Sequence, residues 1–246
     1  MIDRKIYFDS VRGSLFSGGM SQRQVDGQEA ILGEWENQQA DGAMTDLRWL
    51  AYMLATTYHE TSKEMWPIEE YGRGEGMEYG KPDPETGQTY YGRGYVQLTW
   101  RDNYANATQR LDLTGDDDLE WHAAQALDPQ IAADVMFLGM REGWFRSDSK
   151  GKQTLARYFD ADTEDAYNAR EIINGDKSKV PSWSGGVSIG NLIKGYYGDF
   201  LTALRAALVE EPAPPVEEPM VHISIDVPPG VCVSVEVNGE PWDEMA

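Results

Sequence analysis

The chain has 246 residues, of which 41% are hydrophobic, enough for one domain of about 200 residues with a sizeable core and an appended segment. Its net charge of -21 argues against nucleic acid and anionic lipid as partners, because both are bound by clustered lysine and arginine. An acidic cell wall would also repel this charge weakly, so composition gives no support for a wall substrate.

Cysteine usage and the N-terminal residues indicate the compartment. The single cysteine, Cys232, excludes an intramolecular disulfide and favours folding in a reducing cytosol. The N-terminal stretch "MIDRKIYFDSVRGSLF" has scattered charges and no apolar signal core, and no apolar run approaches membrane-spanning length. We therefore expect synthesis in the cytoplasm without a signal peptide and without membrane insertion. Any action outside a cell would then require another route of release.

Helical spacing predicts two helices in the first sixty residues. Residues 21–40 begin with Ser21 and Gln24 at the spacing of a capping box, and their apolar residues fall on roughly one side. A second helix is predicted from a cap at Thr45 to residue 61. Because that helix is apolar nearly all round, we expect it to be buried.

The segment that follows, residues 66–95, is rich in glycine, tyrosine and charge and has no helical period. A loop of this length in a compact domain is usually functional. Thr99 with Asp102 is typical of a cap that opens a helix through about Leu111. Further helices are predicted from Asp128-Pro129, from Thr154, from Thr163 and within residues 188–208. The body is therefore predicted to be mainly α-helical.

The C-terminal part has a different texture. Residues 209–220 form a proline and glutamate stretch typical of a stiff, solvated linker. In residues 221–246 apolar residues alternate strictly on both sides of Pro228-Pro229-Gly230, which predicts a β-hairpin. A lone hairpin is marginally stable in water, so its apolar face must dock on the body, on a second copy or on a partner. The predicted organisation is a body at 1–208, a linker at 209–220 and a hairpin tail at 221–246.

Glu60 is the leading candidate for chemistry. At helical spacing it shares a side with Trp49 and Met53, and burial of a carboxylate raises its pKa, which suits proton donation near neutral pH. The alternative is a solvated residue at an exposed helix end. A glutamate is disfavoured at the negative end of the helix dipole, so a structural role is not obviously served.

Other chemistries lack their residues. A zinc metalloprotease helix needs a second histidine four positions after His59, where Lys63 stands, and the chain has only His122 and His222 besides. Cys232 lies in the predicted hairpin, and the glycine-rich "GRGEG" and "GRGY" do not open a Rossmann unit. We therefore expect no metal and no cofactor. Carboxylate chemistry in an aromatic cleft remains, which is the usual equipment of a glycosidase.

Three ordered motifs, "YHET", "YYGRGYVQLTWRDNY" and "IING", resemble the catalytic domain of glycoside hydrolase family 19, the class I chitinase family. The opening "YFDSVRGSLFSGGMSQRQVDGQEAILGEWE" is similar to phage endolysins of this family, and the resemblance covers roughly residues 4–205. It implies a lysozyme-like, two-lobed helical fold that hydrolyses β-1,4 bonds between N-acetylated amino sugars with inversion. The disulfides of the plant members are missing here.

The resemblance also implies roles for individual residues. It makes Glu60 the general acid and gives Thr99 a part in holding the attacking water. Substrate contacts are implied for Tyr91, Gln97, Asn103 and Asn174.

The second carboxylate is less firmly placed. The spacing in endolysin-like members puts the general base at Glu69. Counting backwards from "YYGRG", as in the plant members, leads to Glu69 or Glu70. Glu75, Glu78 and Glu85 stay open as alternatives, because the glycine-rich loop could fold any of them inward. The plant members of the family also carry a basic residue late in their sequence pattern, and the nearest residue to it in this chain is Lys194.

Three functions follow from the resemblance. The first is an endolysin-type, bacteriolytic peptidoglycan hydrolase, favoured by the N-terminal similarity, the missing signal peptide and the lack of a chitin-binding module. The alternative is a chitinase acting on N-acetylglucosamine polymers, and the minor alternative is a non-catalytic wall-binding protein. A homo-oligomer formed through the hairpin tail is a further expectation.

Overall fold

The computed structural model describes residues 1–209, 228–230, 236–237 and 240–241. The chain divides into two units, Met1–Glu210 and Glu211–Ala246. In the first unit the α-helices are α1 (Arg4–Ser14), α2 (Gln22–Ala40), α3 (Leu47–Glu60), α4 (Arg101–Arg110), α5 (Pro129–Glu142) and α6 (Ile189–Ala207).

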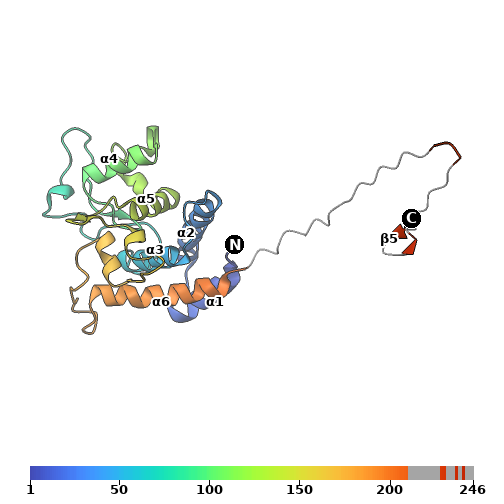
Figure 1. Ribbon diagram of the computed structural model, residues 1–246. Helices are drawn as coiled ribbons and strands as arrows, with labels where there is room; N and C mark the ends of the chain where they lie inside the picture. The colour runs from blue at the N-terminus through green and yellow to red at the C-terminus, as the bar shows by residue number, and fades with distance from the viewer. Residues whose placement is uncertain (210–227, 231–235, 238–239, 242–246) are drawn as a thin grey trace. The chain divides into compact units, whose positions relative to one another are not determined.

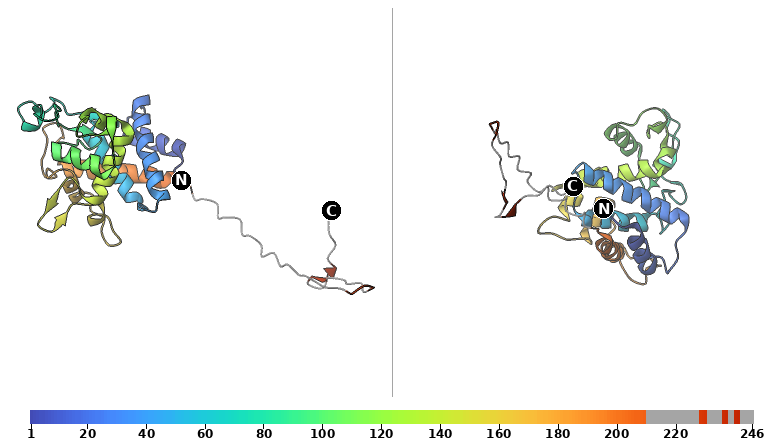
Figure 2. Two further views of the ribbon diagram at one scale, coloured as in Figure 1. Left: turned by 90° about the horizontal axis from the view of Figure 1, so that it is seen from above. Right: turned by 90° about the vertical axis from the view of Figure 1, so that its right-hand side faces the viewer.

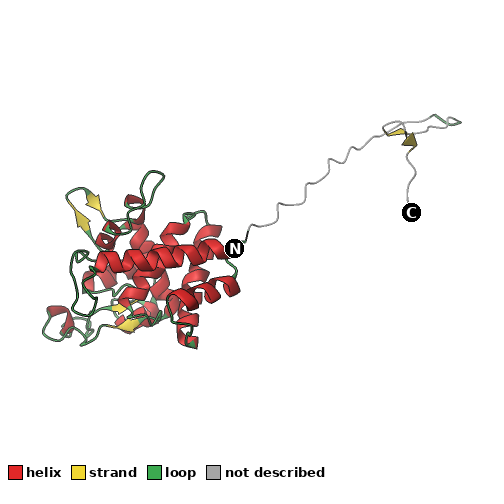
Figure 3. Ribbon diagram, turned by 90° about the horizontal axis from the view of Figure 1, so that it is seen from below, coloured by secondary structure: helices red, strands yellow, loops and turns green. Residues whose placement is uncertain are grey.

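Short elements connect these helices. The 3-10 helices are η1 (Glu78–Gly80), η2 (Gly115–Asp117), η3 (Ala123–Leu127), η4 (Leu155–Arg157) and η5 (Asn168–Ile172). The strands of the first unit are two residues long and pair antiparallel, β1 (Ile68–Glu69) with β2 (Arg93–Gly94) and β3 (Ser147–Asp148) with β4 (Gly151–Lys152). Helices thus dominate this unit (Figure 3), which confirms the predicted mainly α-helical, lysozyme-like fold.

Helix α3 forms the centre of the body (Figure 1). Every residue from Leu50 to Tyr58 is buried, as its apolar composition predicted. Helix α6 packs along α3, α1 packs on α6, and α2 packs against α5 (Figures 1 and 2). The two ends of the body meet where the Asp3 amide donates to the Ala207 carbonyl at 2.8 Å.

Two predicted helix starts are confirmed in atomic detail. The Ser21 hydroxyl accepts from the Gln24 amide, and the Gln24 side chain accepts from the Ser21 amide, which completes a capping box at α2. The Asp128 carboxylate accepts from the amides of Gln130 and Ile131, and Pro129 occupies the first turn of α5. These contacts are local, so the sequence pattern was sufficient.

Two other predicted caps are wrong. Helix α3 is capped by Asp46 rather than Thr45, because the Asp46 carboxylate accepts from the Arg48 amide at 3.0 Å and also pairs with its guanidinium. Helix α4 begins at Arg101 without a side-chain cap. The Thr99 hydroxyl donates instead to the Gln97 carbonyl, at 2.8 Å.

Three further segments differ from the sequence prediction. Thr154 opens only the short η4, and Thr163 opens no helix, since its neighbour Glu164 pairs with Phe159 in an isolated bridge. Helix α1 was not predicted. Its cap is Asp3, whose carboxylate accepts from the Ile6 amide at 2.9 Å.

Residues 66–95 contain only β1, η1 and β2 as regular structure, so the predicted long loop region is present. No helix of the described part of the chain is long and apolar enough to cross a membrane.

The second unit is described only in part. Pro229 and Gly230 form a turn, and β5 (Glu236–Val237) pairs antiparallel with β6 (Glu240–Pro241). Residues 210–220 of the linker predicted at 209–220, and the predicted strand residues 221–227 and 231–235, lie outside the described residues. The predicted domain boundaries stay predictions.

Candidate active site

A cavity of about 490 Å³ opens between the end of α3, the β1–β2 pair and the start of α4. Its polar walls include two carboxylates, three amides and a hydroxyl, from Glu60, Glu70, Gln97, Asn103, Asn174 and Thr99. Segments that are far apart in the sequence therefore place most of the predicted site residues around one space. Cavities of this size hold small ligands in many proteins.

Glu60 is the last residue of α3, and its side chain is only 15% exposed. The guanidinium of Arg170, in η5, forms an ion pair with its carboxylate, and Arg170 is itself 3% exposed. Glu60 therefore lies against a buried cation as well as against apolar side chains. The apolar neighbours Trp49 and Met53 were visible from helical spacing, whereas this cation was not.

Arg170 is shared with a second acid, Asp176. Its Nε donates to one Asp176 oxygen at 2.7 Å and its Nη2 to the other at 3.3 Å. Burial raises the pKa of the Asp176 carboxyl, but the hydrogen bond and charge of Arg170, with a smaller effect of His59, outweigh it and hold this pKa below its ordinary value. Asp176 is therefore ionised at neutral pH and balances the charge of Arg170.

Sequence reasoning missed Arg170 and Asp176. Both flank the "IING" motif, and the Asn174 amide donates to the Arg170 carbonyl at 3.0 Å. Arg170 thus lies one helical turn before the motif residue Asn174, and this spacing was a signal in the sequence that pointed to Arg170 as a site residue. The identity of its partner on α3 was not visible, because Glu60 and Arg170 are 110 positions apart.

Glu69 and Glu70 lie on opposite sides of the β1 backbone. Ile68 and Glu69 pair with Gly94 and Arg93, and the Glu70 amide donates to the Gly92 carbonyl at 2.7 Å. Successive side chains of an extended strand alternate in direction. As a result the Glu70 side chain lines the cavity, whereas Glu69 is not among its lining residues.

The Glu70 carboxylate has two donors, the Tyr79 hydroxyl at 3.2 Å and the Gly92 amide at 3.1 Å. These contacts fix one orientation of the Glu70 side chain. A Cβ at position 92 would lie 2.9 Å from Gln97 Oε1 and 3.3 Å from Gln97 Cβ, so glycine at this position leaves room for the Gln97 side chain.

The Glu69 carboxylate has a different set of partners. The Tyr91 hydroxyl donates to it at 2.5 Å, and the Arg73 guanidinium pairs with it at 2.7 Å. Burial raises the pKa of Glu69, but the hydrogen bond from Tyr91 and the charges of Arg73 and Arg93 have a larger, opposite effect. The pKa of Glu69 is therefore below its ordinary value. Through these contacts Glu69 holds Arg73, early in the long loop, and Tyr91, shortly before β2, in place.

Tyr91, predicted to contact substrate, is 6% exposed and does not line the cavity. Its hydroxyl is bound to Glu69, and the Arg93 guanidinium lies 3.7 Å from the centre of its ring.

The remaining sequence candidates also lie outside this cavity. Glu75 and Lys194 are exposed, Glu78 pairs with Lys81 and Glu85 pairs with Arg101.

A tight turn carries Gln97, Thr99 and Trp100 to the cavity wall. Residues 93 and 98 exchange backbone hydrogen bonds, and the Trp100 amide donates to the Tyr90 carbonyl at 2.9 Å. Gln97 and Trp100 adopt positive φ values of 56° and 75°, a conformation that costs a side-chain-bearing residue about 1–3 kcal/mol. The Asn103 side-chain amide donates to the Thr99 carbonyl at 2.7 Å, which ties α4 to the turn.

The Gln97 amide is oriented by two backbone carbonyls. Its Nε2 donates to Ile68 and to Gly94, each at 3.2 Å.

Within the described residues no three histidine, cysteine, aspartate or glutamate side chains are grouped to hold a metal ion.

Comparison with known proteins gives a likeness of fold. The sequence matches no protein-family profile and no curated protein. The structure is similar to that of chitinase C from Streptomyces griseus HUT6037 and to that of a chitinase C mutant. In both comparisons the TM-score is 0.53 and the identity 18%, and the match covers 83% of this chain and 76% of the other. At this identity the likeness shows that the chain has a fold similar to that of chitinase C.

Proposed function

We propose that this protein is a glycoside hydrolase that cleaves β-1,4 bonds between N-acetylated amino sugars. The observation that carries the proposal is that the carboxylates of Glu60 and Glu70 line one cavity. Most glycosidases use two carboxylates on opposite sides of the scissile bond, one as an acid and the other as a base or nucleophile. The fold likeness to chitinase C supports the same class.

In this proposal Glu60 is the general acid. Of the two acids that bind Arg170, Glu60 lines the cavity and Asp176, which binds the guanidinium at two points, does not. Protonated Glu60 then donates to the glycosidic oxygen as the bond to the sugar breaks. General acid catalysis of this kind contributes about 10²–10⁴-fold to the rate.

Glu70 is the general base that we propose in place of Glu69. As a carboxylate it would take a proton from a water molecule that attacks the anomeric carbon, and Thr99, which lines the same cavity, would help hold that water. Such a mechanism inverts the anomeric configuration and needs about 6.5–9.5 Å between the two carboxyl groups.

The amides of Gln97, Asn103 and Asn174 complete the site. Gln97, whose Nε2 is bound to Ile68 and Gly94, offers its amide oxygen, and Asn103 and Asn174 offer donors and acceptors of the kind that bind acetamido and hydroxyl groups. These amides suit N-acetylated sugar rings.

Two polymers contain such bonds. The endolysin-like N-terminal sequence supports peptidoglycan as substrate, together with synthesis in a host cytoplasm and release by another route. The fold likeness to chitinase C supports chitin as the second candidate. A role of the tail in oligomerisation stays a prediction.

One experiment tests the proposal. Purified peptidoglycan and a chitin hexamer are incubated with the protein, the new ends are identified by mass spectrometry, and the first-formed anomer is identified by NMR. We expect reducing ends of inverted configuration from one or both substrates. Anhydro ends would indicate a lytic transglycosylase, and the absence of cleavage with retained binding would indicate a wall-binding protein.

A further inference from the structure

The cavity that holds Glu60 and Glu70 also has a basic group on its wall. Of the described residues that line it, Arg146 alone is an arginine or a lysine. The two acids and the net charge of -21 repel a carboxylate on a substrate wherever no cation offsets them. Arg146 is therefore the group in this lining that is suited to an acidic substituent.

We propose that Arg146 is a specificity-determining residue that binds a carboxylate of the substrate, and that the cavity therefore takes peptidoglycan rather than chitin. Every second sugar ring of peptidoglycan bears a lactyl group, and a carboxylate lies either on this group or on the peptide attached to it. Chitin has no such group. The inference rests on the proposed function, because it names the substrate of the same cavity.

The position of Arg146 is set by a hairpin and by the "IING" segment. Arg146 directly precedes β3, and the amide of Gln153, directly after β4, donates to its carbonyl at 2.9 Å. The guanidinium lies beside Gly175, where a Cβ would be 2.7 Å from Nη2 and 2.8 Å from Nη1. Glycine at position 175 thus leaves room for the guanidinium next to Asn174, which lines the same cavity.

The charge of Arg146 is only partly neutralised. Its Nη2 donates to Glu171 at 3.2 Å, and the same carboxylate pairs with Lys177 at 3.2 Å. One acid is thus shared by two cations, which leaves an excess of positive charge. The Nε of Arg146 is buried, and no described residue accepts a hydrogen bond from it. The guanidinium therefore keeps both charge and an N–H group that the protein does not use.

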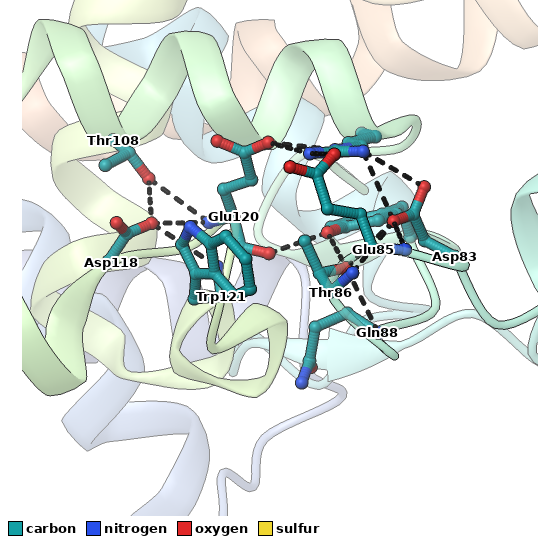
Figure 4. Close-up of polar contacts among 10 residues, drawn as sticks. Asp83, Glu85, Thr86, Gln88, Thr108, Asp118, Glu120 and Trp121 are labelled. Atoms are coloured by element: carbon teal, nitrogen blue, oxygen red, sulfur yellow. Dashed lines mark hydrogen bonds and ion pairs between the residues drawn. The ribbon is translucent and has the colours of Figure 1, made fainter.

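Arg101, at the start of α4, has the opposite arrangement. It lies 2.7 Å from Glu120, 2.8 Å from Glu85 and 3.2 Å from Asp83. Figure 4 labels these three acids and shows that the Asp83 carboxylate also accepts from the amides of Glu85 and Thr86, each at 3.0 Å. Because three acids surround this one cation, Arg101 holds the long loop to α4 and offers no excess charge to a ligand.

Arg146 is also accessible to a ligand, since 38% of its side chain is exposed. Arginine binds carboxylates through paired, charge-assisted hydrogen bonds, which are stronger than those between neutral groups. A carboxylate in the cavity would thus gain from Arg146 more than the amides of the lining can supply.

The test measures hydrolysis of three polymers by the wild type, Arg146→Gln and Arg146→Lys. A chitin hexamer has no carboxylate, peptide-free glycan from peptidoglycan exposes its lactyl carboxylates, and intact peptidoglycan has its carboxylates on the peptides. Arg146→Gln should lower the rate on a carboxylate-bearing polymer by about tenfold or more and leave the hexamer rate nearly unchanged. Arg146→Lys should retain part of the rate, because it keeps the charge without the paired geometry.

The two carboxylate-bearing polymers identify the source of the carboxylate. A loss on the peptide-free glycan assigns the lactyl group, and a loss on intact peptidoglycan alone assigns the peptide.

The matched control is Arg157→Gln. Arg157 also pairs with an acid, Asp148 of the hairpin that follows Arg146, but it does not line the cavity. Its replacement should leave all three rates unchanged. Thermal melting of the variants identifies any that fail to fold.

Three results would overturn the role of Arg146. An equal loss on the hexamer and on the other polymers would mean that Arg146 binds the sugar itself. No loss on any polymer would mean that it binds no part of the substrate, and hydrolysis of the hexamer alone would mean that the cavity takes chitin.

Hydrolysis of no polymer by the wild type would refute the proposed glycosidase activity, which is a separate conclusion. Calorimetric binding of soluble peptide-free glycan and of the hexamer to the wild type and to Arg146→Gln then decides the role of Arg146. Tighter binding of the glycan, lost in the variant, would support it. Equal affinities, or no binding, would exclude it.

Discussion

Arg170 forms an ion pair with Glu60 across 110 positions of sequence and joins η5 to the end of α3. Because Arg170 also binds Asp176, one buried cation is shared by two acids. Glu60 binds the Nη1 of this guanidinium, and Asp176 binds its Nε and Nη2.

The Glu60→Gln change should reduce hydrolysis by at least about 10²-fold, because the amide keeps the shape of the side chain but cannot donate the proton. Release of reducing ends from the substrate that the wild type cleaves measures the loss. Circular dichroism should show an unchanged fold. A near wild-type rate would mean that Glu60 is not the acid.

The bases are distinguished by comparing Glu70→Gln with Glu69→Gln. We expect Glu70→Gln to lose most of the activity, because Glu70 lines the cavity. Glu69→Gln should keep much of it but lower the free energy of unfolding by about 1–2 kcal/mol, since Tyr91 and Arg73 lose a charged acceptor. Rates and urea unfolding are measured on the same preparations. Equal, mild losses of rate would place the base elsewhere in the loop.

The Asp176→Asn change should move the alkaline limb of the pH–rate profile to lower pH. The pKa of Asp176 is lowered, so it is charged at neutral pH and offsets Arg170. Without that charge Arg170 acts on Glu60 alone and favours its ionised form, which is inactive as an acid.

Asp148→Asn is the control for this change. It also removes a carboxylate from an arginine pair, with Arg157, but at an exposed position that does not line the cavity. Its pH–rate profile should match that of the wild type. An unshifted profile for Asp176→Asn would contradict the proposed coupling.

Stability should fall as the pH rises from about 4 to 7 because of Asp134. Burial raises the pKa of this carboxyl to about 7, with a further contribution from Glu34. The Gln130 side-chain amide connects the two acids, at 2.9 Å from Asp134 and 3.2 Å from Glu34. The folded state then holds a proton that the unfolded state has released, so stability is greatest below the unfolded pKa and is lost as the pH rises through the folded one.

The change Asp134→Asn tests this. Urea unfolding at pH 5 and pH 8 should show a smaller difference between the two pH values in the variant than in the wild type. The Glu34→Gln change should act in the same direction, because it removes the neighbouring charge. An identical pH dependence in all three proteins would show that Asp134 titrates normally.

Local sequence was sufficient for part of the fold. The capping box at Ser21 and the cap at Asp128 involve residues at most three positions apart, and the buried α3 follows from apolar residues on every side of one helix. Where two local caps compete, as Thr45 and Asp46 do, the ion pair of Asp46 with Arg48 decided the outcome.

The motif resemblance placed Glu60, Gln97, Thr99, Asn103 and Asn174, and the structure groups all five around one cavity. Which of Glu69 and Glu70 lines that cavity was beyond sequence, because a shift of one position in a strand exchanges its two faces.

The sequence by itself thus determined the helical body, which depends on neighbours a few positions apart, and it named the motif residues through their resemblance to a known family. Tertiary structure alone decided the partner of Glu60, the direction of Glu70 and the exposed position of Trp100. The physical reason is that ion pairs and cavity walls form between segments that only the folded chain brings into contact.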